Sequence, residues 1–169
     1  MYIDDTVALI SRRLNSVFGI ERDHIDNVDF LNVQTFIVSL PTSIATSILK
    51  TWMNAWTTSR RFHEETIHSC LFGCQHSGDA LSHYITCGRL WRSVLWSRHG
   101  RFDNCSVIER LLLLHPSTIR AFDLAVAFRV YHDVKIKRLD HVLTLRDTDV
   151  RSLARLVKQS ALGARKALA

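Results

Sequence analysis

CLFGCQHSGDALSHYITC, residues 70–87, decides the fold of this 169-residue chain, because it gathers three of the four cysteines around a histidine. Cys70, Cys74, His83 and Cys87 form a C-x3-C-x8-H-x3-C array. Thiolate and imidazole are the ligands that a tetrahedral Zn2+ prefers, and a short chain commonly supplies them as two closely spaced pairs. Protein side chains fill all four positions, so the array predicts one structural zinc ion and not a hydrolytic centre.

The two pairs of the array are expected in different local structures. Residues 70–74 predict a tight turn, in which Gly73 adopts a backbone conformation that other residues resist. Residues 79–97 predict a helix with Asp79 as its N-cap. His83 and Cys87 are four residues apart, so both would lie on one face of that helix.

Other interpretations of these residues stay open. His63, His68 and His76 lie close enough in the sequence to be alternative ligands. Cysteine is among the most frequently buried residue types, so the cysteines and His83 could also belong to an ordinary core. A disulfide framework is a weaker alternative, since Met1 leads directly into acidic Asp4 and Asp5 and not into a signal peptide. Cys105 stands apart and is predicted to be a buried thiol.

Composition favours a small helical protein. Apolar residues make up 47% of the chain and charged residues 22%, as in ordinary globular domains. Only two prolines and six glycines interrupt it, which favours helix throughout. No apolar run approaches the roughly 18 residues of a membrane span. We therefore expect a mainly α fold with little or no β-structure, stapled by the zinc knuckle.

Apolar spacing and capping residues divide the chain further. We expect helices over residues 5–18, 106–114, 116–138 and 147–167, and an extended segment over residues 28–40 that ends at Pro41. Ile44, Ile48, Trp52 and Trp56 at helical spacing predict another helix, capped by Thr42 or Ser43. All four tryptophans are expected in the core. Three segments result: residues 1–40, the zinc-knuckle domain over 41–104, and the basic helical segment over 105–169.

Positive charge is concentrated near the C-terminus. Residues 129–169 carry ten basic and four acidic side chains, so the whole net charge of +6 lies there. Arg151, Arg155, Lys158 and Arg165 would form a row about 20 Å long on one helix face. Such a row can follow a phosphate backbone, or it can be the solvated side of an amphipathic helix. Arg60 and Arg61, beside Trp56 and Phe62, are further candidates for binding nucleic acid.

Together these motifs resemble a known family. NAWTTSRRFH at residues 54–63, CLFGC at 70–74, then Asp79, His83-Tyr84, Cys87 and Trp91 are similar to the zinc-binding tail of reverse transcriptases from non-LTR retrotransposons. AFRVYH at residues 127–132 also resembles the helical segment that closes such reading frames. The similarity covers roughly residues 40–138. The three-residue gap between His83 and Cys87 departs from the commoner spacing of four, which leaves room for a different fourth ligand.

YIDD at residues 2–5 is similar to the Y-x-D-D palm motif of the same family. The resemblance implies that Asp4 and Asp5 lie in a hairpin turn and are vestigial ligands of the catalytic Mg2+ ions. Two-metal phosphoryl transfer needs carboxylates from more than one strand, and this chain has neither the fingers nor the rest of the palm. Alternatively, Asp4 or Asp5 starts a helix.

From these features the expected function is a zinc-stabilised, non-catalytic remnant of a retroelement reverse transcriptase that binds RNA or DNA weakly and without sequence specificity. No membrane and no small-molecule substrate are expected, and the location would be nuclear or cytoplasmic. One alternative is a structural helical remnant without a binding function. Another is a part of a reverse transcriptase that is active only within a longer polyprotein.

Overall fold

Helices form most of the chain in the computed structural model, which describes residues 2–65, 68–75, 77–101 and 104–139, with Arg155, Val157, Lys158, Gln159 and Leu162. Within these residues the one β-type pairing is an antiparallel bridge between Ser69 and Gly78. The prediction of a mainly α fold with little β-structure is confirmed. The helix predicted over residues 147–167 falls mostly outside the described residues.

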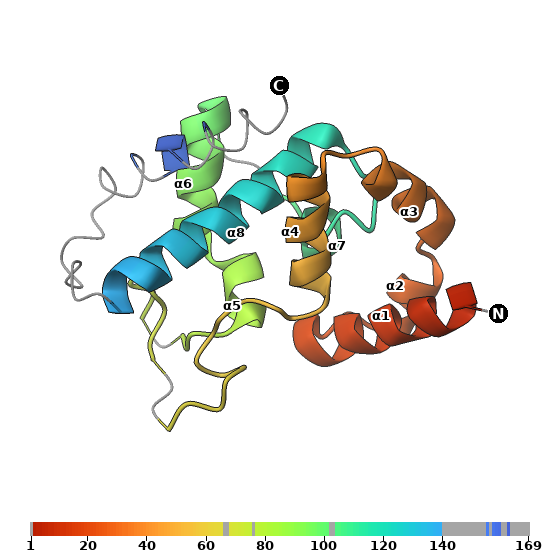
Figure 1. Ribbon diagram of the computed structural model, residues 1–169, viewed down its shortest axis with the longest axis horizontal. Helices are drawn as coiled ribbons and strands as arrows, with labels where there is room; N and C mark the ends of the chain where they lie inside the picture. Colours follow the sequence, from red (N-terminus) through yellow and green to blue (C-terminus); the bar gives the residue numbers. More distant parts are fainter. Residues whose placement is uncertain are drawn as a thin grey trace.

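The N-terminal part of the fold is built from four successive helices (Figure 1): α1 (Tyr2–Phe18), α2 (Arg22–Asp26), α3 (Phe30–Val38) and α4 (Thr42–Trp52). α1 ends at Gly19, which has a φ of +66° and donates its N–H to the carbonyl of Asn15 at 2.9 Å. A left-handed residue at this position closes the helix, and glycine adopts it without steric cost. α1 then packs against α2 and α4.

The prediction of an extended segment over residues 28–40 was wrong, because most of these residues form α3. The carboxylate of Asp29 caps the helix by accepting the N–H of Asn32 at 3.0 Å. Val33 and Ile37 lie four residues apart and are both buried on one face. Burial of that face outweighs the preference of β-branched residues for strands, which is weak and depends on context.

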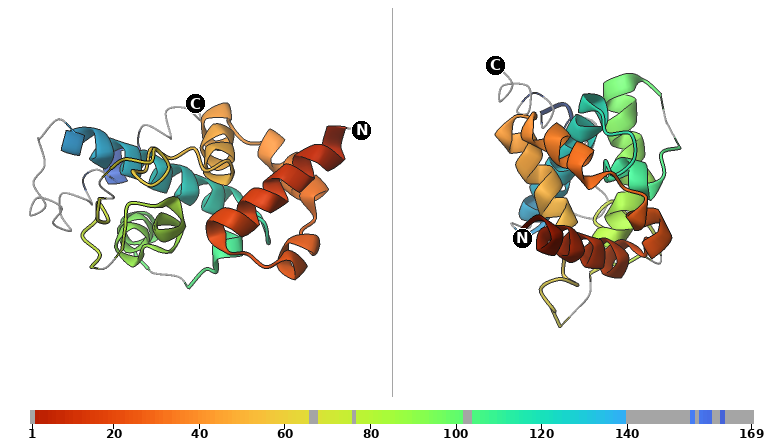
Figure 2. Two further views of the ribbon diagram at one scale, coloured as in Figure 1. Left: turned by 90° about the horizontal axis from the view of Figure 1, so that it is seen from below. Right: turned by 90° about the vertical axis from the view of Figure 1, so that its right-hand side faces the viewer.

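Four further helices complete the described fold: α5 (Leu81–Thr86), α6 (Gly88–His99), α7 (Val107–Arg110) and α8 (Thr118–Leu139). α8 is the longest, and it lies across α4 and against α6 (Figures 1 and 2). Ala121 and Ala125 on α8 are fully buried. Small side chains at such positions let neighbouring helices approach closely. α8 therefore joins the N-terminal helices to the part of the chain that carries the cysteines.

Two predicted helices are shorter than expected. The helix over residues 79–97 is interrupted at Cys87, which separates α5 from α6. The helix over residues 106–114 ends as α7 at Arg110, after a capping box between Ser106 and Glu109. Leu112 beyond it has a φ of +64° and is fully buried. At these interruptions Cys87 joins the cysteine–histidine cluster and Leu112 joins the apolar core.

One continuous cluster of buried apolar side chains extends through all three predicted segments, from Leu14 on α1 to Val134 on α8. Trp52, Trp56 and Trp91 belong to it, as expected. The expectation was wrong for Trp96, which is 66% exposed on α6. No helix in the described part of the chain has both the length and the apolar character needed to cross a bilayer.

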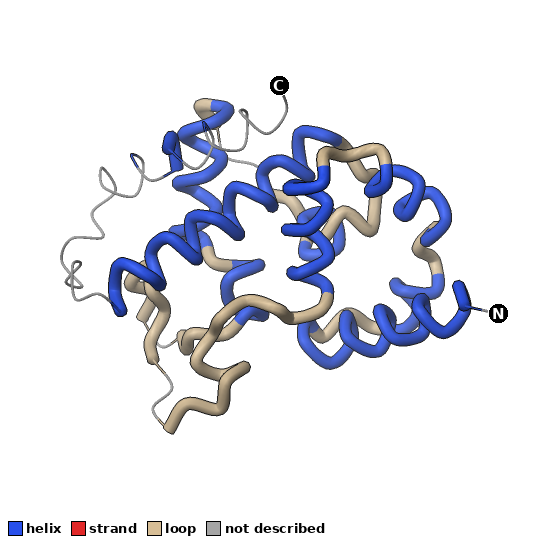
Figure 3. The backbone as a smooth tube through the Cα atoms, viewed as in Figure 1, coloured by secondary structure: helices blue, strands red, loops and turns tan. Residues whose placement is uncertain are grey.

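A long loop joins α4 to α5 and carries half of the predicted metal ligands (tan in Figure 3). Its residues 53–80 contain turns and the Ser69–Gly78 bridge but no helix in the described positions. Its backbone hydrogen bonds are those of turns and of the bridge, such as that from the Gly73 N–H to the Cys70 carbonyl at 3.0 Å, and side-chain interactions add to them. Two sets of interactions do so: the cysteine–histidine cluster and a buried carboxylate.

Candidate metal centre

Cys70, Cys74, His83 and Cys87 lie together in the structure as their spacing predicted. One ligand atom from each residue falls within 4.8 Å of all the others. The sulfurs of Cys74 and Cys87 are 3.6 Å apart, and those of Cys70 and Cys87 are 3.9 Å apart. Tetrahedral coordination with metal–sulfur bonds of about 2.3 Å places two sulfurs about 3.8 Å apart. The four side chains could therefore hold a metal ion without a large rearrangement.

The first pair of cysteines is positioned by a turn. Gly73 has a φ of +78° and donates its N–H to the carbonyl of Cys70 at 3.0 Å. The N–H of Phe72 points at the Cys70 sulfur, 3.4 Å away. A Cβ atom on residue 73 would lie only 2.8 Å from the guanidinium of Arg89. Glycine is therefore favoured here by its backbone conformation, whereas the guanidinium of Arg89 ends a flexible side chain that could move aside for a Cβ atom.

The second pair is positioned by the break between two helices. His83 lies on α5, whereas Cys87 is both the C-cap of α5 and the N-cap of α6. Cys87 is extended, with a ψ of 103°, which turns its side chain toward the other ligands. The indole of Trp91 donates to the carbonyl of Tyr84 at 3.0 Å and so satisfies an acceptor near the break. The predicted single helical face was wrong, although the two ligands do converge.

Ionisation within the cluster suits a metal ligand set. The hydrogen bond with Cys87 lowers the pKa of Cys70 to about 5, and the same contact raises the pKa of Cys87. Burial raises the pKa of Cys74. Without a cation, the close packing of the three sulfurs favours ionisation of one cysteine and opposes ionisation of the other two. A bound cation would stabilise all three thiolates.

His83 carries an unsatisfied atom. Its Nε2 is buried and has no hydrogen-bond partner in the described structure. An unpaired buried ring nitrogen is costly, and coordination to a metal is one of the ways in which proteins satisfy it. Coordination to the same metal ion as the three cysteines would satisfy this nitrogen.

The alternative ligands and pairings do not fit the described residues. His68 contacts Glu64 at 3.3 Å, and neither His63 nor His68 belongs to the cluster. His76 lies outside the described residues. The measured sulfur–sulfur distances are far longer than the roughly 2.05 Å of a disulfide. Cys105 lies apart from the cluster, as predicted, but it is half-buried, so the prediction of a buried thiol was wrong.

A second feature beside the cluster is a buried ionic network around Asp79, which is fully buried. One carboxylate oxygen accepts from the N–H of Ser59 at 2.8 Å and from Lys135 Nζ at 2.9 Å. The other accepts from the hydroxyls of Tyr84 at 2.7 Å and Tyr131 at 3.2 Å. The prediction of Asp79 as a helix N-cap was wrong, because Ala80 occupies that position.

The network keeps Asp79 ionised. Burial alone would raise its pKa, but hydrogen bonds from Ser59, Lys135 and Tyr84 outweigh burial and hold the pKa below its ordinary value. Burial and the nearby carboxylate raise the pKa of the phenols of Tyr84 and Tyr131, so both remain donors. The Tyr84 hydroxyl in turn accepts the N–H of Leu71 at 3.1 Å, which connects the network directly to the knuckle.

Sequence patterns could not have identified this network. Asp79 and Lys135 are 56 positions apart. In the sequence, Lys135 is only one of ten basic residues between positions 129 and 169. The one signal was indirect: Asp79 is the carboxylate nearest to the array, between the second cysteine and the histidine.

The predicted nucleic-acid residues are only partly described. Arg60 and Arg61 are exposed in the loop after α4, and Arg61 lies over the ring of Phe62 at 5.1 Å. Arg155 and Lys158 are exposed and helical. Arg151 and Arg165 lie outside the described residues, so the predicted row stays a prediction.

The structure places the YIDD segment in the first turn of α1 and not in a hairpin turn. The side chain of Asp5 is exposed. Within the described chain, the only group of three or more histidine, cysteine or acidic side chains suited to a metal is the Cys70–Cys74–His83–Cys87 cluster. Asp4 and Asp5 therefore lie inside α1, which begins at Tyr2, so the alternative that one of them starts the helix is not met either.

Comparisons of the chain with protein-family profiles, with curated proteins and with solved structures find no match. The interpretation of the site accordingly depends on its own geometry.

Proposed function

We propose that this chain binds a single structural zinc ion through Cys70, Cys74, His83 and Cys87, and that it is a non-catalytic module for binding nucleic acid. The observation that supports the metal is the convergence of four ligand atoms within 4.8 Å. Three sulfurs and one imidazole in this arrangement suit Zn2+ better than Mg2+ or Ca2+, which take oxygen ligands.

The binding role is supported by how the site holds the neighbouring loop. Asp79 lies between Cys74 and His83, and its side chain fixes the backbone of Ser59. Its carbonyl oxygen accepts the N–H of Arg60 at 3.4 Å. The exposed side chains of Arg60, Arg61 and Phe62 are therefore presented by a loop that the zinc site and Asp79 hold in place. Guanidinium groups bind phosphate, and an exposed aromatic ring can stack on an unpaired base.

An absence of catalysis belongs to the same proposal. A catalytic zinc keeps one coordination position for water or substrate, whereas four protein ligands complete a tetrahedral shell. The helical conformation of YIDD does not resemble the hairpin of a palm active site. Origin as a remnant of a non-LTR retroelement reverse transcriptase rests on the sequence resemblance alone.

A structural remnant without binding function is the second candidate. It is favoured by the burial of Trp52, Trp56 and Trp91, which leaves these rings unavailable for stacking on bases. The two candidates make different predictions for the interaction with a nucleic-acid strand.

The test combines metal content with binding. Elemental mass spectrometry of the purified chain is expected to give one zinc per chain. A fluorescent single strand is expected to bind with micromolar affinity, and log affinity should fall with log salt at a slope of roughly −3, as for four or five phosphate contacts. Protein without bound metal, or a binding signal independent of salt, would contradict the proposal.

A further inference from the structure

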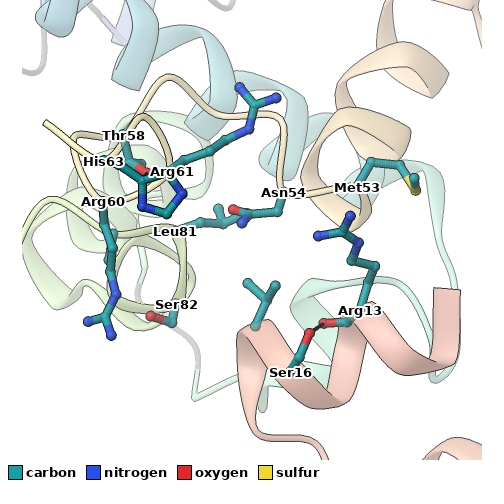
Figure 4. Close-up of a pocket in the computed structure, with 12 residues that line it drawn as sticks. Arg13, Ser16, Met53, Asn54, Thr58, Arg60, Arg61, His63, Leu81 and Ser82 are labelled. Atoms are coloured by element: carbon teal, nitrogen blue, oxygen red, sulfur yellow. Dashed lines mark hydrogen bonds between the residues drawn. The ribbon is translucent and has the colours of Figure 1, made fainter. Parts of the chain in front are cut away.

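A cleft of about 480 Å3 opens between α1 and the loop that follows α4 (Figure 4). Arg13 projects from α1 on one side of it, and Arg60 and His63 come from the loop on the other. Asn54 lies between them, and Ser82 on α5 completes the wall below Arg60. Three separate parts of the chain thus contribute polar side chains to one concave surface.

The charge of this cleft has one sign. Its ionisable lining residues are Arg13, Arg60, Arg61 and His63, and none of the carboxylates in the described part of the chain lines it. Elsewhere in the described structure arginines do pair with carboxylates, as Arg120 does with Glu109 at 3.0 Å. Among the described residues, no carboxylate lies within ion-pair distance of Arg13, Arg60 or Arg61. Concave surfaces lined by one sign of charge concentrate ligands of the opposite sign.

The walls are also held in place. Asn54 has a φ of +53° and donates its N–H to the carbonyl of Thr51 at 3.0 Å. The backbones of Ser59 and Arg60 are bonded to buried Asp79, as described above. Less ordering is needed when a ligand binds to groups whose backbone is already fixed, and this improves affinity.

We propose that this cleft binds the phosphate groups of a single nucleic-acid strand, with Arg13 and Arg60 on opposite walls as the phosphate ligands. The inference rests on the proposed function and assigns its binding site. The planar guanidinium fork matches a phosphate, and the Asn54 amide and the Ser82 hydroxyl supply neutral donors nearby. Arg13 lies far from the loop arginines in sequence and was not among the predicted residues.

The shape of the site favours a single strand over a duplex. A flexible strand can bend its backbone into a cleft, whereas a duplex presents its phosphates on a rigid convex surface. Phe62 follows the loop arginines and is 54% exposed, so its ring can stack on an unpaired base.

The experiment compares single arginine variants in the full chain. Affinity for a labelled RNA strand of about ten nucleotides is measured by fluorescence anisotropy between about 50 and 200 mM salt. Arg13→Gln and Arg60→Gln are each expected to weaken binding about fivefold and to make the salt slope shallower by about 0.7. Arg12→Gln is the matched control, because Arg12 lies on the same helix but lines a different surface, with Arg22 and Asp26. It is expected to change affinity less than about twofold.

The outcomes separate the cleft from the proposed function. If the unmodified chain binds the strand but Arg13→Gln and Arg60→Gln behave like Arg12→Gln, the cleft is not the site and the proposed function still stands. If the unmodified chain binds no strand, the proposed function fails and the cleft fails with it.

Polyglutamate and a duplex of the same length serve as competitors. Displacement of the strand by polyglutamate or by duplex as effectively as by unlabelled strand would overturn the assignment. All three arginines are exposed, and unchanged circular dichroism and zinc content verify that each variant folds.

Discussion

The four N-terminal helices, α1 to α4, and the knuckle region, which comprises the loop after α4 and α5, are held together in different ways. α1 to α4 bury apolar side chains at helical spacing, among them Leu14, Val33 and Ile48. The region from the loop after α4 to α5 has little regular helix, and it combines buried side chains such as Trp56, Phe72 and Leu81 with polar contacts around Asp79 and the cysteine cluster. The first region is stabilised mainly by area buried from water, whereas the second also depends on a few specific polar contacts.

This difference has consequences for stability. Truncation of a buried apolar side chain in the N-terminal helices leaves a cavity and costs about 2 to 5 kcal/mol, depending on how far its neighbours relax. A polar cluster is sensitive for a different reason, because removing one member leaves its partners buried and unsatisfied. The two regions share α8, which packs against α4 and also supplies Tyr131 and Lys135 to the Asp79 network.

Removal of the proposed zinc ion should have the largest effect. Structural zinc contributes on the order of 10 kcal/mol to folding in small domains. Chelation, or the substitution Cys87→Ser, is expected to speed amide exchange across residues 68–87, measured by hydrogen–deuterium exchange and mass spectrometry. Amides of α3 and α4 should keep most of their protection, because their apolar contacts do not involve the cluster.

Cys105→Ser is the matched control, since this cysteine lies outside the cluster. It should retain one zinc per chain and the exchange pattern of the unmodified protein. Retention of zinc and of protection in Cys87→Ser would show that the knuckle does not depend on these ligands. Uniform loss of protection over α3 and α4 would instead show that the two regions form one cooperative unit.

Disruption of the ionic network around Asp79 should have the second-largest effect on stability. Asp79→Asn removes the charge that pairs with buried Lys135, and breaking a buried pair costs about 3 to 5 kcal/mol. Lys135→Met is expected to cost less, because the carboxylate keeps three donors: the Ser59 N–H and the two tyrosine hydroxyls. The free energies of unfolding come from urea titrations in excess zinc.

The double variant Asp79→Asn with Lys135→Met tests the pairing directly. It should be more stable than the sum of the single losses predicts, because neither charge remains without its partner. Asp26→Asn changes an exposed carboxylate and controls for net charge. Additive losses in the double variant would mean that Asp79 and Lys135 act independently.

The parts of this structure that sequence could predict are those encoded locally. The ligand cluster follows from four residues within a short segment, and α4 follows from the spacing of Ile44, Ile48 and Trp52. Two details of α4 were wrong: Trp56 lies beyond its end, and Pro41 occupies the N-cap predicted for Thr42 or Ser43. The segment over residues 28–40 was misassigned because its β-branched residues favour strands, whereas the Asp29 cap and the burial of Val33 and Ile37 favour helix.

What sequence could not predict depends on distant contacts. α5 ends and α6 begins at Cys87, whose side chain belongs to the ligand cluster. The helix propensities of the residues do not reflect such a contact. Asp79 was assigned to a cap because its partners Tyr131 and Lys135 are more than 50 positions away. Arg13 was not predicted at all, because only the tertiary fold brings α1 beside the loop that carries Arg60.

The smallest expected effect is a pH dependence that arises at the junction of the two regions. His132 on α8 packs at 4.1 Å from the ring of Phe128 and at 6.1 Å from that of Trp56, measured between ring centroids. Burial lowers the pKa of His132, and nearby Lys50 lowers it further, against opposing effects of the Phe128 carbonyl and Asp133. In the unfolded chain the pKa returns to about 6.5.

The unfolded state therefore binds the proton more readily than the folded state. The contribution of His132 to stability is fully present above about pH 6.5 and is lost as the pH falls below it, at no more than about 1.4 kcal/mol per pH unit. Urea titrations between about pH 7.5 and 5.5 in excess zinc should show this decline, and His132→Gln should make it shallower. His24→Gln, at an exposed position on α2, should leave the decline unchanged. An equal decline in the unmodified protein and in His132→Gln would assign the acid sensitivity to the zinc ligands and not to the packing of α8 against the knuckle loop.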